Sequence, residues 1–206
     1  PFGLASPAAW LRRASVATRS VDVSRDRLPD GEIASANLVA FYLPMHTATR
    51  LAAPLIDREK RVNPSARIAA YGLYAPLHAE WLRSRGVTDV LGPEAEQDLV
   101  KLALSCGASL SGLPDGPNQP SRSPLRRSAE ASAEAEGSAP QMSEGHPKLQ
   151  FITPDRKTLP PLSRYAALQM PDGSTRVVGS TDATRGCKHL CRHCPIVPVY
   201  RGQFRV

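Results

Sequence analysis

The sequence has few aromatic residues and no long apolar run. Only 5% of its 206 residues are Phe, Trp or Tyr, whereas it has 20 prolines and 14 glycines. This composition argues against one core running from end to end and predicts an ordered part beside a disordered part. No apolar stretch approaches the roughly 18–20 residues of a membrane-spanning helix, so no membrane partner is expected.

Cysteine is also scarce, and its distribution argues against a secreted disulfide framework. Three of the four cysteines, Cys187, Cys191 and Cys194, lie within eight residues, and the fourth, Cys106, is distant. Three neighbouring thiols are typical of a metal or cluster site in a reducing compartment. We therefore expect a cytoplasmic protein.

The chain carries a formal net charge of +7, and most of it falls near the end. The segment 176–206 contains six basic residues and one acidic residue. A nucleic-acid surface would usually add interleaved aromatic side chains, and only Tyr200 and Phe204 lie nearby, so a nucleic-acid partner is not expected. A solvated face or a small anionic partner beside the cysteines accounts for the charge.

Short apolar runs alternate with helical patterns over residues 1–106. Runs typical of strands occur at 37–43, 67–74 and 87–91, with a weaker candidate at 16–23. Helical spacing occurs at 4–13, 47–61, 77–85 and 94–105. This order predicts an α/β fold, a Rossmann-like doubly wound parallel sheet. Because such a fold normally begins with a strand, we expect its first strand to precede Pro1.

The character of the chain changes after residue 106. The segment 107–150 has no aromatic residue and is rich in Pro, Ser, Ala and Glu. It cannot bury enough apolar surface to offset its ordering entropy, so we expect a disordered linker. The segment 151–206 then begins a second domain, with a hairpin expected from 164–169 and 175–180 around Pro171–Ser174.

The three clustered cysteines form the pattern Cys-x3-Cys-x2-Cys. Three thiolates can hold three irons of a [4Fe–4S] cluster, which leaves the fourth iron open to a small molecule. The alternative is a zinc module, in which His189 or His193 completes a Cys3His site with Cys187, Cys191 and Cys194. Both histidines lie inside the loop, where closing one tetrahedron with all three cysteines would strain the backbone.

A strand followed by Arg-Gly-Cys-x3-Cys-x2-Cys-Pro, here 185–195, resembles the start of radical S-adenosylmethionine (SAM) enzymes. The resemblance implies the opening of a partial (β/α) barrel and a [4Fe–4S] cluster on Cys187, Cys191 and Cys194. It also implies that the open iron binds SAM, which the reduced cluster cleaves to a 5′-deoxyadenosyl radical. His193 occupies the position, usually aromatic in the family, that lies near the adenine of SAM.

The resemblance further implies a reductant such as flavodoxin or ferredoxin, and a small-molecule or peptide substrate that the motif does not identify. A complete barrel needs about 250 residues, far more than the segment 151–206 supplies. We therefore expect activity in a longer parent protein and an inactive fragment here. We also expect residues 176–206 to be poorly packed and Arg185 to be an exposed charge, although a role in placing the cluster or the SAM carboxylate is the alternative.

Residues 1–105 are similar in character to the cobalamin-binding domain that precedes the barrel in one radical SAM group. That resemblance makes cobalamin a candidate ligand beyond the carboxyl ends of the strands, at 44–46, 74–76 and 92–93. The Asp-x-His-x2-Gly signature of cobalt-ligating proteins is absent. His46 is a candidate substitute ligand, and the alternative is a structural or solvated histidine. A non-catalytic ligand-binding Rossmann domain also stays open as an alternative function.

Overall fold

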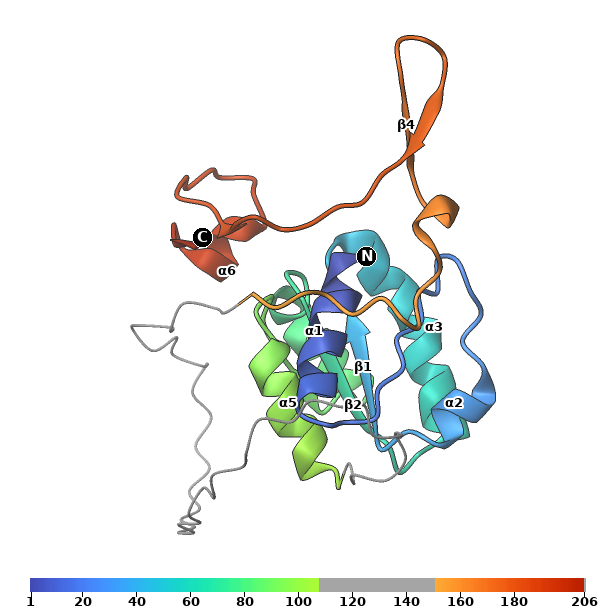
Figure 1. Ribbon diagram of the computed structural model, residues 1–206. Helices are drawn as coiled ribbons and strands as arrows, with labels where there is room; N and C mark the ends of the chain where they lie inside the picture. The colour runs from blue at the N-terminus through green and yellow to red at the C-terminus, as the bar shows by residue number, and fades with distance from the viewer. Residues whose placement is uncertain (108–150, 206) are drawn as a thin grey trace, which may run out of the picture. The chain divides into compact units, whose positions relative to one another are not determined.

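A three-stranded parallel sheet lies at the centre of the first hundred residues (Figure 1). The computed structural model describes residues 1–107 and 151–205, which belong to one compact unit. The strands follow the order β1 (Leu38–Tyr42), β2 (Arg67–Tyr71) and β3 (Asp89–Val90). In register, Leu38 lies opposite Arg67 and Ala69 opposite Asp89. The expected α/β chain with a parallel sheet is confirmed.

Helices cover both faces of this sheet. The side chains of β2 alternate between the two faces, so each face presents apolar side chains to a helix layer. On one face, Ile68 and Ala70 pack with residues of α3 (His46–Val62) and α4 (Ala79–Ser84), including Ala52, Ile56 and Leu82. On the other face, Tyr71 packs against Leu99 of α5 (Glu96–Ser105). The Tyr71 hydroxyl donates to the carbonyl of Gly3 in α1 (Phe2–Arg13) at 2.9 Å, so α1 shares this face.

Two expectations for the first quarter of the chain need correction. The first helix begins at Phe2 rather than at the expected residue 4, and it continues through Pro7. Residues 16–23 form no strand, because their N–H groups bond elsewhere: Val16 donates to Leu11 O at 2.9 Å and Ser20 to Thr158 Oγ1 at 3.0 Å. The remaining elements before residue 107 are α2 (Asp30–Ala34) and the 3-10 turn η1 (Pro76–His78).

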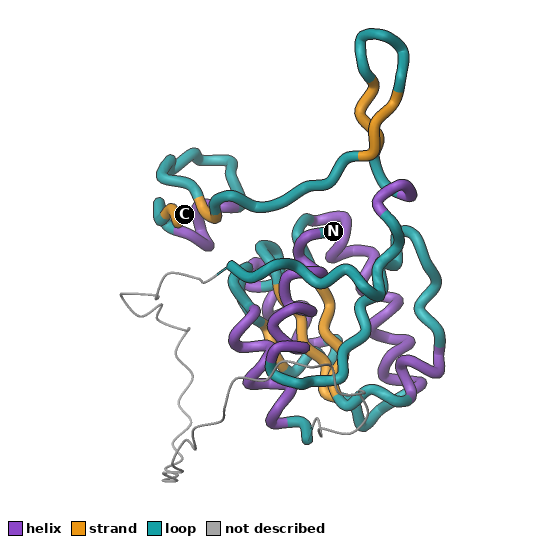
Figure 2. Tube along the Cα trace, viewed as in Figure 1, coloured by secondary structure: helices purple, strands orange, loops and turns teal. Residues whose placement is uncertain are grey.

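The segment 151–205 contains η2 (Leu162–Arg164), β4 (Ala167–Gln169), β5 (Thr175–Val177), β6 (Arg185–Gly186), α6 (Ile196–Tyr200) and β7 (Phe204–Arg205) (Figure 2). The expected hairpin is confirmed: β4 and β5 pair antiparallel across a turn in which Gly173 has φ +81°. The predicted linker at 107–150 lies outside the described residues, apart from Gly107.

The chain after residue 150 packs along α1. The Asp155 N–H donates to Ala5 O at 2.9 Å, and the Asp155 carboxylate pairs with Arg12 at 2.9 Å. Further on, Arg164 pairs with Asp26 at 2.8 Å. These contacts join the two described stretches. Neither stretch contains a helix with the length and apolar character needed to cross a membrane.

Candidate metal centre

The three clustered cysteines lie on the loop between β6 and α6, hereafter the cysteine loop (residues 187–194). Its base is a short antiparallel pair in which Gly186 lies opposite Phe204. The Cys187 N–H extends this pairing by donating to Gln203 O at 3.1 Å. At the far end, the Cys194 N–H donates to Cys191 O at 3.3 Å, which closes a turn just before α6. Both ends of the cysteine loop are thus fixed by backbone hydrogen bonds.

The backbone at Gly186 explains why a glycine precedes the first cysteine. Its φ is +81°, a value that side-chain-bearing residues rarely adopt. A Cβ at this position would lie 2.8 Å from the Tyr200 ring and would also collide with the carbonyl of Gln203. Glycine therefore allows the chain to turn from β6 into Cys187 beneath α6.

All three thiols of the cysteine loop are free and reachable by solvent. Cys191 is exposed, and Cys187 and Cys194 are half-buried. Within residues 1–107 and 151–205, no three His, Cys, Asp or Glu side chains are grouped closely enough to hold a metal ion. The structure thus places the three cysteines on one loop without converging their sulfur atoms. As a donor set, three accessible thiols on eight residues fit a thiolate-ligated cluster.

The two histidines of the cysteine loop, His189 and His193, are both exposed. His193 lies in the turn between Cys191 and Cys194. Cys106 lies at the end of α5, where its N–H caps the helix by donating to Leu102 O at 3.2 Å. Cys106 therefore lies outside the cysteine loop.

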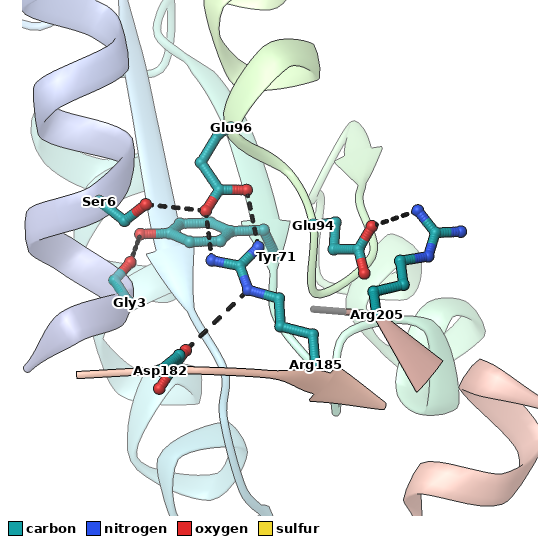
Figure 3. Close-up of polar contacts among 8 residues, drawn as sticks. All are labelled: Gly3, Ser6, Tyr71, Glu94, Glu96, Asp182, Arg185 and Arg205. Atoms are coloured by element: carbon teal, nitrogen blue, oxygen red, sulfur yellow. Dashed lines mark hydrogen bonds and ion pairs between the residues drawn. The ribbon is translucent and has the colours of Figure 1, made fainter. Parts of the chain in front are cut away.

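Arg185, two residues before Cys187, is not the exposed charge that the sequence predicts (Figure 3). Its side chain is 9% exposed and forms two hydrogen bonds with the Glu96 carboxylate, at 2.6 and 3.1 Å. Burial alone would lower the pKa of Arg185, but hydrogen bonding to Glu96 and the charge of that carboxylate outweigh it and raise the pKa. Arg185 therefore stays charged in its buried position.

A second arginine of the same strand pair makes a similar contact. Arg205 of β7 binds Glu94 at 2.7 Å, with 18% and 17% of the two side chains exposed. Tyr200 of α6 is also buried, at 8% exposed. The expectation that residues 176–206 pack poorly is therefore wrong for these three side chains. In the sequence, the acidic residues before and within the first turn of α5 indicate a favourable helix dipole but give no sign of their partners.

The carboxyl ends of the strands, the expected ligand edge, gather three aromatic or imidazole rings. His46 begins α3 after β1, and Tyr74 and His78 follow β2. The rings of His46 and His78 are 6.4 Å apart, and Tyr74 stacks on His78 at 6.0 Å. His78 lies in η1, beside both rings.

No family model matches the chain, and no curated protein or solved structure matches it. The assignment of function therefore depends on the residues of the cysteine loop and their surroundings.

Proposed function

We propose that this chain is part of a radical SAM enzyme, in which Cys187, Cys191 and Cys194 bind a [4Fe–4S] cluster. The observation that carries the proposal is the Cys-x3-Cys-x2-Cys pattern on one loop directly after the β6 strand. The three thiols are free and accessible, as ligands loaded after folding need to be. Three protein ligands leave one iron of such a cluster without a protein donor.

Held by these three thiolates, a reduced cluster would supply the electron for cleavage of SAM to a 5′-deoxyadenosyl radical. The chain's own residues have simpler roles in the proposal. The three thiolates hold the metal, and the His193 ring, beside Cys194, offers a flat surface for adenine. Gly186 and the Cys187 N–H fix the start of the cysteine loop relative to β7. As part of the same proposal, the first stretch is a doubly wound Rossmann-like domain, and the segment after residue 150 is the opening of a partial barrel.

Anaerobic reconstitution with iron and sulfide tests the ligand assignment. We expect a brown protein with about four iron and four sulfide per chain, and loss of both in Cys187→Ser, Cys191→Ser and Cys194→Ser variants. Cys106→Ser is the matched control, because its thiol lies in another element, and it should retain the full metal content. A colourless chain that binds one zinc through the cysteine loop would instead establish the Cys3His alternative.

We propose cobalamin as a second ligand, at the edge formed by His46, Tyr74 and His78. These rings follow the carboxyl ends of β1 and β2, where parallel sheets bind ligands. A change in the cobalt absorption spectrum on adding the chain to hydroxocobalamin, lost in His46→Ala and retained in His189→Ala, would support this proposal. An unchanged spectrum with the wild-type chain would contradict it.

A further inference from the structure

Arg185, which leads into the cysteine loop, is surrounded by residues of α1, α5 and the start of the second described stretch. Phe2 and Ser6 come from α1, Glu96 from α5, and Phe151 from the start of the second stretch. Glu96 accepts two hydrogen bonds from Arg185 and a third from Ser6 Oγ at 2.9 Å. The Arg185 guanidinium also lies 5.4 Å from the Phe151 ring centroid and 6.0 Å from that of Phe2. The arginine is therefore enclosed by an anion and two aromatic rings.

Bidentate arginine–carboxylate contacts fix orientation as well as position, because two parallel N–H groups meet two oxygens. Glu96 is 3% exposed and Arg185 is 9% exposed, so solvent screens this pair poorly. The Ser6 hydroxyl donates to the same carboxylate. The Asp182 carboxylate lies 4.0 Å from Arg185 and forms a weaker ion pair with it. Removing either partner of such a pair leaves a buried charge without compensation.

A second ion pair, between Arg205 and Glu94, accompanies the pair between Arg185 and Glu96. Arg185 and Arg205 are direct cross-strand neighbours in the β6–β7 pair. Like charges facing each other across a strand pair are destabilising, and strands of two residues are marginal without support. Glu96 and Glu94 each neutralise one of these arginines. The β6–β7 pair thus depends on the two carboxylates, and these contacts are called the docking pairs below.

The docking pairs are connected to the cysteine loop through the backbone. Arg185 is separated from Cys187 only by Gly186, and the Cys187 N–H is bonded to Gln203 O, two residues before Arg205. A displacement of either arginine therefore shifts the first cysteine. The other two cysteines follow along the same loop into α6.

We propose that Arg185 is a positioning residue, and that its docking on Glu96, with Arg205 on Glu94, orders the cysteine loop from the N-terminal sheet domain. The ordering itself is a property of the metal-free chain. Its consequence for metal retention rests on the proposed cluster function.

Alkylation of Cys187, followed by peptide mass analysis of the metal-free chain, tests the ordering. In Glu96→Gln, we expect Cys187 to react at least about tenfold faster, since a broken buried ion pair favours local opening. Arg192→Gln is the matched control, because this arginine lies exposed on the same loop, and it should leave the rate unchanged. Cys106, just after α5, reports on the N-terminal domain, and its alkylation rate should stay the same in both variants.

A second variant separates docking from general unfolding. Arg185→Gln/Glu96→Gln removes both charges and leaves no buried ion unpaired, so the domain should fold, with the circular dichroism and Cys106 rate of the wild type. Cys187 should still react faster than in the wild type, because two amides hold the strand less firmly. A wild-type Cys187 rate in this folded double variant would overturn the proposal.

Metal retention distinguishes this proposal from the proposed function. If the wild-type chain assembles a cluster, we expect a ferrous chelator to remove iron several-fold faster from Glu96→Gln than from Arg192→Gln. Equal rates would overturn the link between docking and metal retention. A wild-type chain that binds no iron would count against the cluster, whereas the alkylation result would still decide whether Arg185 orders the loop.

Discussion

At the scale of single residues, the most unusual group is the carboxylate of Glu59 in α3. Glu59 is 0% exposed, and neither side-chain oxygen has a hydrogen-bond partner in the described part of the chain. Burial raises the pKa of Glu59 from 4.5 to about 7. A folded-state pKa above the unfolded value means that the folded chain holds an extra proton between these pH values.

The free energy of unfolding should therefore fall as the pH rises from about 4.5 to 7, by roughly 2–3 kcal/mol. Above pH 7 this contribution no longer changes with pH. Urea unfolding at pH 5 and pH 8 measures the difference. Glu59→Gln should remove most of it, whereas Glu80→Gln, at an exposed position of α4, should not. A pH dependence that survives in Glu59→Gln would show that other groups cause it.

At the scale of elements, the long helix α3 has one face in the core and one in solvent. Ile56 is 0% exposed and packs in the cluster that contains Leu82 and Ile68, whereas Leu51 on the same helix is 63% exposed. Ile56→Ala should lower the free energy of unfolding by about 2–5 kcal/mol, because it removes buried methyl groups and leaves a cavity. Leu51→Ala should change it by less than about 0.5 kcal/mol.

Urea denaturation of the two variants under identical conditions checks the orientation of this helix. Similar losses of stability in both variants would contradict the assignment of the buried face.

The elements also show which parts of the fold a sequence can predict. β1 and β2 are recognisable because a strand covered on both faces becomes a continuous apolar run, whereas β3 contains only Asp89 and Val90. Residues 16–23 contain valines at positions 16, 21 and 23 but form no strand. Their backbone bonds to α1 and to Thr158, a partner 138 residues away that no local pattern reveals.

At the scale of the whole molecule, the described stretches 1–107 and 151–205 are joined by ion pairs between distant residues. Arg185 and Glu96 are 89 residues apart, so each looks in the sequence like an ordinary surface charge. The cysteine spacing is local and therefore visible in the sequence, as is the hairpin turn at Gly173. The docking of the cysteine loop is visible only once the chain is folded, because two opposite charges carry no sequence signal of mutual contact.

The proposed function draws on residues from both described stretches of the chain. The sheet domain supplies Glu94 and Glu96, the later segment supplies the thiols, and the two meet at the β6–β7 pair. On this account, the N-terminal domain holds the cysteine loop in place, in addition to binding any ligand of its own.

The most direct test of the central claim is electron paramagnetic resonance of the reconstituted and reduced chain, with and without SAM. Three cysteine ligands leave one iron open, so SAM should bind there and change the g-values of the reduced cluster. Cys106→Ser should show the same change, because this thiol lies at the end of α5, outside the cysteine loop. An iron–sulfur signal that stays identical at saturating SAM, or a chain that takes up zinc in place of iron and sulfide, would contradict the account.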